Sequence, residues 1–154
     1  MRVEYINPFV EAAFDILKEV LGDDIQRGEL YLKTTSQSVM GVAAFVGLAG
    51  NVEGRVLFDM SMETALAIAS EMNGEILTEL DDLGKATITE LANMITAQAV
   101  TKLHDLGFTF DLTPPAIFTG DNMEITDNEV EALIVPVITK QGKIEINVAV
   151  RERT

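Results

Sequence analysis

The residues whose types and spacing could do chemistry are Glu90 and Asn93, three positions apart in a long segment of helical periodicity. Positions i and i+3 share one face of a helix, so a carboxylate and a carboxamide are expected side by side. A carboxylate can pair with a cation, and a carboxamide both accepts and donates hydrogen bonds, so it can hold a water molecule. An ordinary solvated helix face gives the same pattern, so the spacing alone does not assign a function.

Several other chemistries are excluded by residue types that are missing or rare. The chain has no cysteine, which excludes thiolate nucleophiles, disulfides, zinc fingers and iron–sulfur clusters. Its one histidine, His104, leaves no histidine-rich metal site, and its position predicts a surface residue near a helix end. Asp81 and Asp82 precede a helix, where they are expected to cap it rather than bind a metal. We therefore expect no metal or cofactor of the protein's own.

Length and charge limit the domain organisation and the partners. The 154 residues, of which 47% are hydrophobic, suffice for one compact domain over residues 1–154. Lys and Arg total 11 against 25 Asp and Glu, a formal net charge of −14. Such a chain is a poor partner for nucleic acids or anionic membranes. No signal peptide or membrane-spanning run is found, so a soluble, cytoplasmic protein is expected.

Helical patterns predict three helices. The first begins at Asn7, as its cap, and Pro8, and it stops near Gly22. The second begins at Ser61 and ends at Asn73. The third runs from Asp81 or Asp82 to Leu106.

Strand patterns occupy residues 29–35, 39–48, 51–60, 108–112, 116–119, 130–139 and 144–150, and Pro136 predicts an edge or a bulge in its strand. Consecutive strands with short turns predict an α+β fold of two layers, an antiparallel sheet packed against long helices. The similar order of elements in the two halves suggests a weak internal duplication.

The third helix is expected to have two distinct faces. The buried stripe is Ile88, Ala92, Ile95, Ala99, Leu103 and Leu106, flanked by Leu91 and Thr96. The opposite face carries Glu90 and Asn93 together with Ala86, Met94, Ala97, Thr101 and His104. Small side chains beside the polar pair leave room for the backbone of a protein partner.

The strand over residues 39–48 is apolar on both faces. It is therefore expected either to lie centrally in the sheet or to meet a second subunit, and a sheet-mediated homodimer is the preferred reading.

The segment Thr89-Glu90-Leu-Ala-Asn93-Met-Ile, inside a long central helix, resembles the Glu-x-x-Asn signature of the CheX/CheC/FliY family of chemotaxis response-regulator phosphatases. The strand and helix over residues 54–60 and 65–74, and Pro115 some twenty residues after Asn93, extend the resemblance over nearly the whole chain, closest to CheX. It implies a CheC-like fold, a homodimer, and hydrolysis of the aspartyl phosphate of a phosphorylated CheY-type response regulator. Asn93 would orient the attacking water, Glu90 would dock on the regulator's active-site lysine, and Mg²⁺ would sit on the regulator.

The chain departs from the family pattern at two places. Ala86 stands where the family often has Asp or Ser. The first helix matches the signature only at Glu4 and Asn7, where Asn7 is expected to be a cap, which implies one active site per subunit. The alternative to an enzyme is a non-catalytic interaction or flagellar-switch-like module that binds a response regulator.

Overall fold

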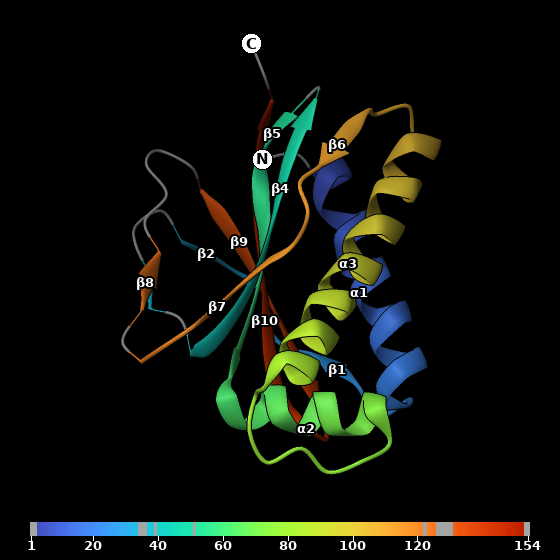
Figure 1. The fold of residues 1–154 in the computed structure, drawn as a ribbon. Coiled ribbons are helices and arrows are strands. Elements are labelled where there is room, and N and C mark those ends of the chain that lie inside the picture. Colours follow the sequence, from blue (N-terminus) through green and yellow to red (C-terminus); the bar gives the residue numbers. More distant parts are fainter. Residues whose placement is uncertain are drawn as a thin grey trace.

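The computed structural model describes residues 3–33, 37–38, 40–50, 52–121, 123–125 and 131–152. An antiparallel sheet is covered on one face by helices (Figure 1). The helices are α1 (Val3–Leu21), α2 (Met62–Asn73) and α3 (Asp82–Asp105). The strands are β1 (Gln26–Arg27), β2 (Tyr31–Lys33), β3 (Gln37–Ser38), β4 (Gly41–Gly50), β5 (Val52–Ser61), β6 (Phe110–Leu112), β7 (Ala116–Thr119), β8 (Glu124–Ile125), β9 (Ala132–Thr139) and β10 (Gly142–Glu152). The expected α+β architecture is confirmed.

The main sheet has the order β1-β9-β10-β5-β4-β6, with β2 also paired to β9 and β7 also paired to β4. Alternate residues face opposite sides, so Val56, Phe58 and Met60 of β5 point into the core under the helices. In Figure 1, α1 and α3 run side by side along the sheet and α2 crosses below them. No helix in the described part of the chain is long and apolar enough to cross a membrane.

Strand β4 lies inside the sheet, which is one of the two positions predicted from its apolar sequence. It pairs with β5 on one side and with β6 and β7 on the other. Val42 and Ala44 are buried in the core beneath the helices, and Ala43 is buried with Leu57 on the opposite face. A single chain therefore accounts for the apolar character of β4, and the expected homodimer stays a prediction.

The first helix begins earlier than the sequence predicts. Helix α1 starts at Val3 and contains Pro8, so Asn7 is an exposed residue inside the helix and not its cap. The added turn buries Tyr5, whose ring meets Phe108 edge-on at a centroid distance of 5.0 Å. Burial of this kind outweighs the one intrahelical hydrogen bond that Pro8 removes.

Pro136 does not lie at an edge of the sheet, but it faces a bulge, so the second of the two expected settings is confirmed: residues 28–30, between β1 and β2, stand opposite only residues 135 and 136 of β9. Strand β9 pairs with β10 on one side and with β1 and β2 on the other. The nitrogen and the carbonyl of a strand residue point to the same side, and the Pro136 carbonyl accepts a bond of 2.8 Å from the Gly28 N–H. Since Gly28 lies in the gap between β1 and β2, the missing N–H of proline faces the one interruption in the neighbouring pairing.

Candidate functional site

Helix α3 places both predicted site residues on its exposed side. Glu90 and Asn93 are exposed, as are Ala86 and Ala97, which lie about one turn before and after the pair. Among the described residues, no hydrogen bond or ion pair involves the side chain of Glu90 or of Asn93. The sequence correctly predicts this shared face, and both polar groups are available to a partner.

Two other predictions for this helix are wrong. Leu106 was expected in the buried stripe, but it is 61% exposed because the helix ends at Asp105 and Leu106 is its C-cap. Met94 was expected on the exposed face, but it is partly buried against the core. His104 is exposed near the end of the helix, as predicted, and its Nε2 accepts a bond of 3.5 Å from the Phe110 N–H.

The start of α3 is fixed by a cap and by a contact with α2. Asp81 is the N-cap, and its Oδ1 accepts a hydrogen bond of 3.0 Å from the Gly84 N–H. This confirms a capping role for Asp81. At the end of α2, Asn73 Nδ2 donates to Thr87 Oγ1 at 2.8 Å, one turn before Glu90. The contact holds the first turns of α3 against α2, so Glu90 has a defined position.

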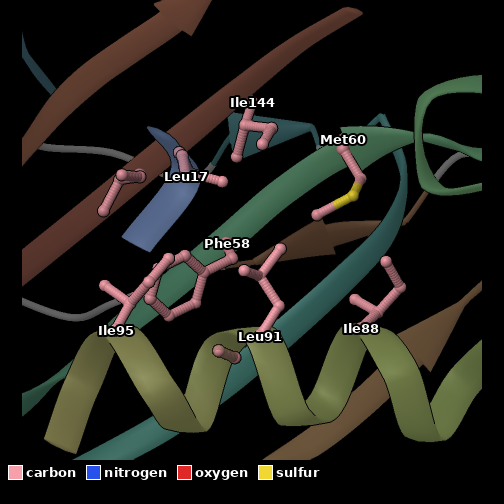
Figure 2. A pocket seen from close by; sticks show the side chains of 9 residues that line it. Leu17, Phe58, Met60, Ile88, Leu91, Ile95 and Ile144 are labelled. Atoms are coloured by element: carbon pink, nitrogen blue, oxygen red, sulfur yellow. The ribbon is translucent and has the colours of Figure 1, made fainter. Parts of the chain in front are cut away.

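The side of α3 opposite the polar pair is anchored by apolar packing. Figure 2 shows Ile88, Leu91 and Ile95 of α3 pointing toward Phe58 and Met60 on the sheet. The space between them is a cavity of about 10 Å³ lined by apolar side chains. This space is at most the size of one water molecule, and the apolar side chains offer it no polar partner, so it is a packing defect and not a ligand site.

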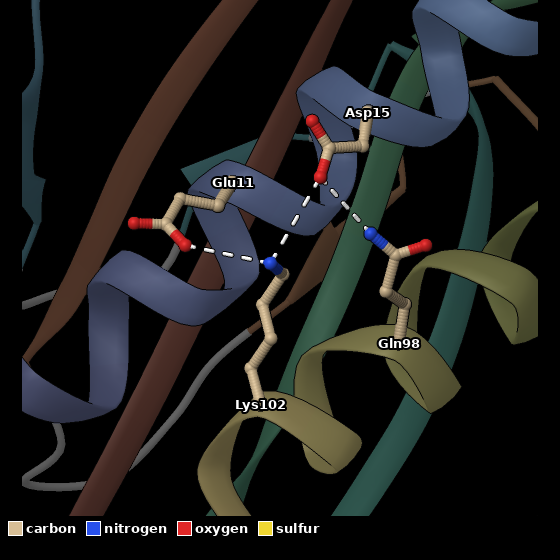
Figure 3. Close-up of polar contacts among 4 residues, drawn as sticks. All are labelled: Glu11, Asp15, Gln98 and Lys102. Atoms are coloured by element: carbon tan, nitrogen blue, oxygen red, sulfur yellow. Dashed lines mark hydrogen bonds and ion pairs between the residues drawn. The ribbon is translucent and has the colours of Figure 1, made fainter. Parts of the chain in front are cut away.

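The C-terminal half of α3 is tied to α1 by polar contacts. Lys102 Nζ lies 3.6 Å from Glu11 Oε2 and 3.9 Å from Asp15 Oδ2, and Gln98 Nε2 donates to Asp15 Oδ2 at 3.1 Å (Figure 3). Exposed ion pairs of this kind contribute about 0 to 1 kcal/mol each. Their effect is to fix how the two helices lie against each other. Helix α3 is thus held at its start, along its underside and near its end.

A second polar cluster lies on the face of the sheet away from the helices. Arg55 Nη1 donates to Asn147 Oδ1 at 2.8 Å, and Asp59 Oδ1 accepts from the Met40 N–H at 2.8 Å. The Tyr31 hydroxyl donates to Glu145, and burial, followed by this bond, raises the pKa of Tyr31 to about 12. These bonds join side chains of neighbouring strands, or a side chain and the backbone, and so stabilise the sheet.

The sequence around the site is strongly acidic. Between Met62 and Ala97 the sequence has seven acidic residues and a single basic residue, Lys85. Within the described ranges, no group of three or more acidic, histidine or cysteine side chains could hold a metal ion. The face that carries Glu90 and Asn93 can therefore bind a cationic group of a partner and hold a water by the amide.

Helix α1 contains a second glutamate and asparagine three residues apart, and the sequence alone did not predict that both lie inside this helix. Glu4 and Asn7 are both exposed and lie within α1, three residues apart, like Glu90 and Asn93 in α3. One turn beyond Asn7 stands Glu11, which pairs with Lys102, whereas one turn beyond Asn93 stands Ala97. The Asn73–Thr87 bond was missed as well, because nothing in the sequence connects the end of one helix with a turn of the next.

Comparison with known proteins identifies relatives over most or all of the chain. Residues 42–138 match the family described as chemotaxis phosphatase CheX. The CheY-P phosphatase CheX of Thermotoga maritima is 29% identical over 126 residues, which are 81% of each chain. A chain in the crystal structure of the CheX-CheY-BeF3-Mg²⁺ complex from Borrelia burgdorferi is 46% identical, with a TM-score of 0.86 over 98% of this chain and 100% of the other.

A CheC-like superfamily protein from Shewanella sp. PV-4 is 26% identical, with a TM-score of 0.88 over 98% of this chain and 99% of the other. The exposed Glu-x-x-Asn pair thus lies in a fold shared with solved CheX and CheC-like structures. Because the family match covers well over half of the chain, this protein belongs to the chemotaxis phosphatase CheX family.

Proposed function

We propose that Glu90 and Asn93 hydrolyse the aspartyl phosphate of a phosphorylated CheY-type response regulator. The observation that carries the proposal is the exposed pair on α3, which has no partner among the described residues and lies on a helix anchored at three places. Support comes from the relatives, one of which is named a CheY-P phosphatase, while another is seen in a complex with CheY.

The reaction needs little from this chain beyond positioning. Water attacks the phosphorus in line with the bond to the regulator's aspartate. The P–O bond to the water oxygen forms as the P–O bond to the aspartate breaks. The electron pair of the broken bond leaves with the aspartate carboxylate. The products are inorganic phosphate and a free carboxylate. Mg²⁺ on the regulator would neutralise the phosphoryl oxygens.

Asn93 would orient the water and would not remove its proton. A carboxamide is not basic near neutral pH, but its oxygen accepts a hydrogen bond from the water, and its Nδ2 can donate to a phosphoryl oxygen. Correct placement of the attacking water lowers the barrier by the proximity effect. Glu90 would contact the lysine of the regulator's active site, and this charged contact would set the register in which Asn93 enters.

The experiment is the decay of a phosphorylated CheY-type regulator with substoichiometric protein, followed by phosphate release. The expected result is many turnovers per molecule, lost in Asn93→Ala and in Glu90→Lys. Binding of the regulator without accelerated decay would instead favour the interaction-module alternative.

A further inference from the structure

Apolar side chains are exposed within an acidic surface at the start of α3, next to the site. Leu83 is 44% exposed, and Ile76, in the connection from α2 to α3, is 88% exposed. The exposed charged residues of the same segment are acidic: Glu75, Glu79, Asp81 and Asp82. These six residues are named the α2–α3 patch. The established activity of the family and the proposed roles of Glu90 and Asn93 give none of them a task beyond the helix cap.

The patch lies within reach of any protein seated on the polar pair. Leu83 precedes Glu90 by seven residues, which is two turns, so it shares the face of Glu90 at about 10 Å along the helix. Ile76 follows Asn73 by three residues, and Asn73 contacts Thr87. Three steps between consecutive Cα atoms span at most about 11 Å, so Ile76 is kept near the first turns of α3.

The exposure of Ile76 is fixed by its neighbours along the chain. The Leu77 N–H donates to Ser70 Oγ at 2.9 Å, and the Glu75 N–H donates to the Ser70 carbonyl at 3.2 Å. Leu77 itself packs against the core. Ile76 therefore lies between two residues whose backbones are bonded to α2, and it could turn inward only if these bonds broke.

We infer that the α2–α3 patch is the surface that docks the body of the response regulator while Asn93 reaches its phosphoryl group. This inference rests on the proposed function. A stable protein interface buries about 800 Å² on each partner, which corresponds to a circle of about 16 Å radius, so an interface centred on Glu90 and Asn93 includes Leu83. Apolar anchors enclosed by charged residues are the usual composition of such a contact.

The same chemistry specifies the surface that fits. The regulator must present an apolar depression for Leu83 and Ile76, with Lys or Arg at its rim opposite the acidic residues of the patch. The patch touches no reacting atom, so its residues determine affinity and not the rate of the bound complex. Loss of an anchor should raise KM and leave kcat unchanged.

The test is the dependence of phosphate release on the concentration of phosphorylated regulator, for Leu83→Ser and Ile76→Ser. Leu106→Ser and Leu32→Ser are matched controls, because these leucines are 61% and 57% exposed outside the patch. We expect KM to rise about fivefold or more in each patch variant, with kcat within twofold of the parent and both controls unchanged. An unchanged KM in both patch variants, or the same rise in the controls, overturns the inference.

Direct binding separates this inference from the proposed function. The affinity for the regulator carrying beryllofluoride and Mg²⁺ is measured by calorimetry, with Asn93→Ala included. If the patch variants bind at least fivefold more weakly while Asn93→Ala binds like the parent, the patch is supported whether or not the parent hydrolyses phosphate. If hydrolysis by the parent is normal and the patch variants bind as tightly as the parent does, only the patch is refuted.

Discussion

Replacement of Asn93 by alanine should lower activity and raise stability. Asn93 is exposed in the middle of α3, and no described residue bonds to its side chain. Removing the amide therefore costs no contact, and alanine is the better helix former by roughly 0.5 kcal/mol. For a chain of this size, 1 kcal/mol shifts Tm by about 2 to 4 °C, so the variant should melt about 1 to 2 °C higher.

The rate should fall steeply in the same variant. If Asn93 acts by placing the water, its loss removes positioning, an effect worth roughly 100-fold in rate. The assay is single-turnover phosphate release from the phosphorylated regulator at saturating protein, with Tm measured on the same preparations by calorimetry. A drop in rate together with a rise in Tm is the signature of a residue retained for function at some cost in stability.

Asn7→Ala is the matched control, because Asn7 is also exposed inside a helix and follows a glutamate by three residues. It should show a similar small gain in Tm and no change in rate. The reasoning is refuted if Asn93→Ala keeps the parent rate. It is also refuted if Tm falls along with the rate, because the lost activity would then follow from damage to the helix.

Glu90→Lys should raise KM for the regulator at least tenfold, because it sets a cation against the regulator's lysine. Glu19→Lys, on the exposed side of α1, should leave KM unchanged. Equal effects of the two substitutions would contradict a docking role for Glu90. Ala97→Glu should lower kcat/KM at least tenfold with Tm within about 2 °C, since it fills the space beside Asn93, and an unchanged kcat/KM would mean that no close approach occurs there. Tyr31 should ionise near pH 12 in an absorbance titration, later than the ordinary value of 10.0, and the late step should be absent in Tyr31→Phe. Because the pKa of Tyr31 is raised in the folded protein, the stability that this tyrosine contributes is present below pH 10 and is lost between pH 10 and about 12. A titration with a single ionisation step near pH 10 would contradict the raised pKa.

Signals that act locally were predictable from the sequence. Ser61 caps α2 by accepting from the Thr64 N–H at 3.1 Å, as its position before a helical pattern predicts. The bounds of α3 and the shared face of Glu90 and Asn93 follow from helical periodicity in the same way. Residues 116–119 form β7, as predicted.

Predictions were wrong where contacts between distant parts of the chain determine the local structure. The start of α1 depends on Tyr5 packing against Phe108, about a hundred residues away, which overrides the local signal of Asn7 and Pro8. For Pro136 the bulge itself was predicted, but not that the extra residue belongs to another part of the chain, beside Gly28. Strands of two residues, such as β1, are too short to give any periodic pattern.

The two pairs of glutamate and asparagine show why spacing alone is a weak signal for this chemistry. Both pairs have the same residue types and spacing and lie exposed in a helix, one in α1 and the other in α3. The pairs differ at the residue one turn after each asparagine. In α1 this residue is Glu11, which extends toward Lys102, and in α3 it is Ala97, whose short side chain leaves space beside Asn93. An asparagine that must enter the active site of another protein needs free space beside it more than it needs a particular neighbouring residue. We therefore expect the α3 pair to be the active one, for a reason that lies outside the signature itself.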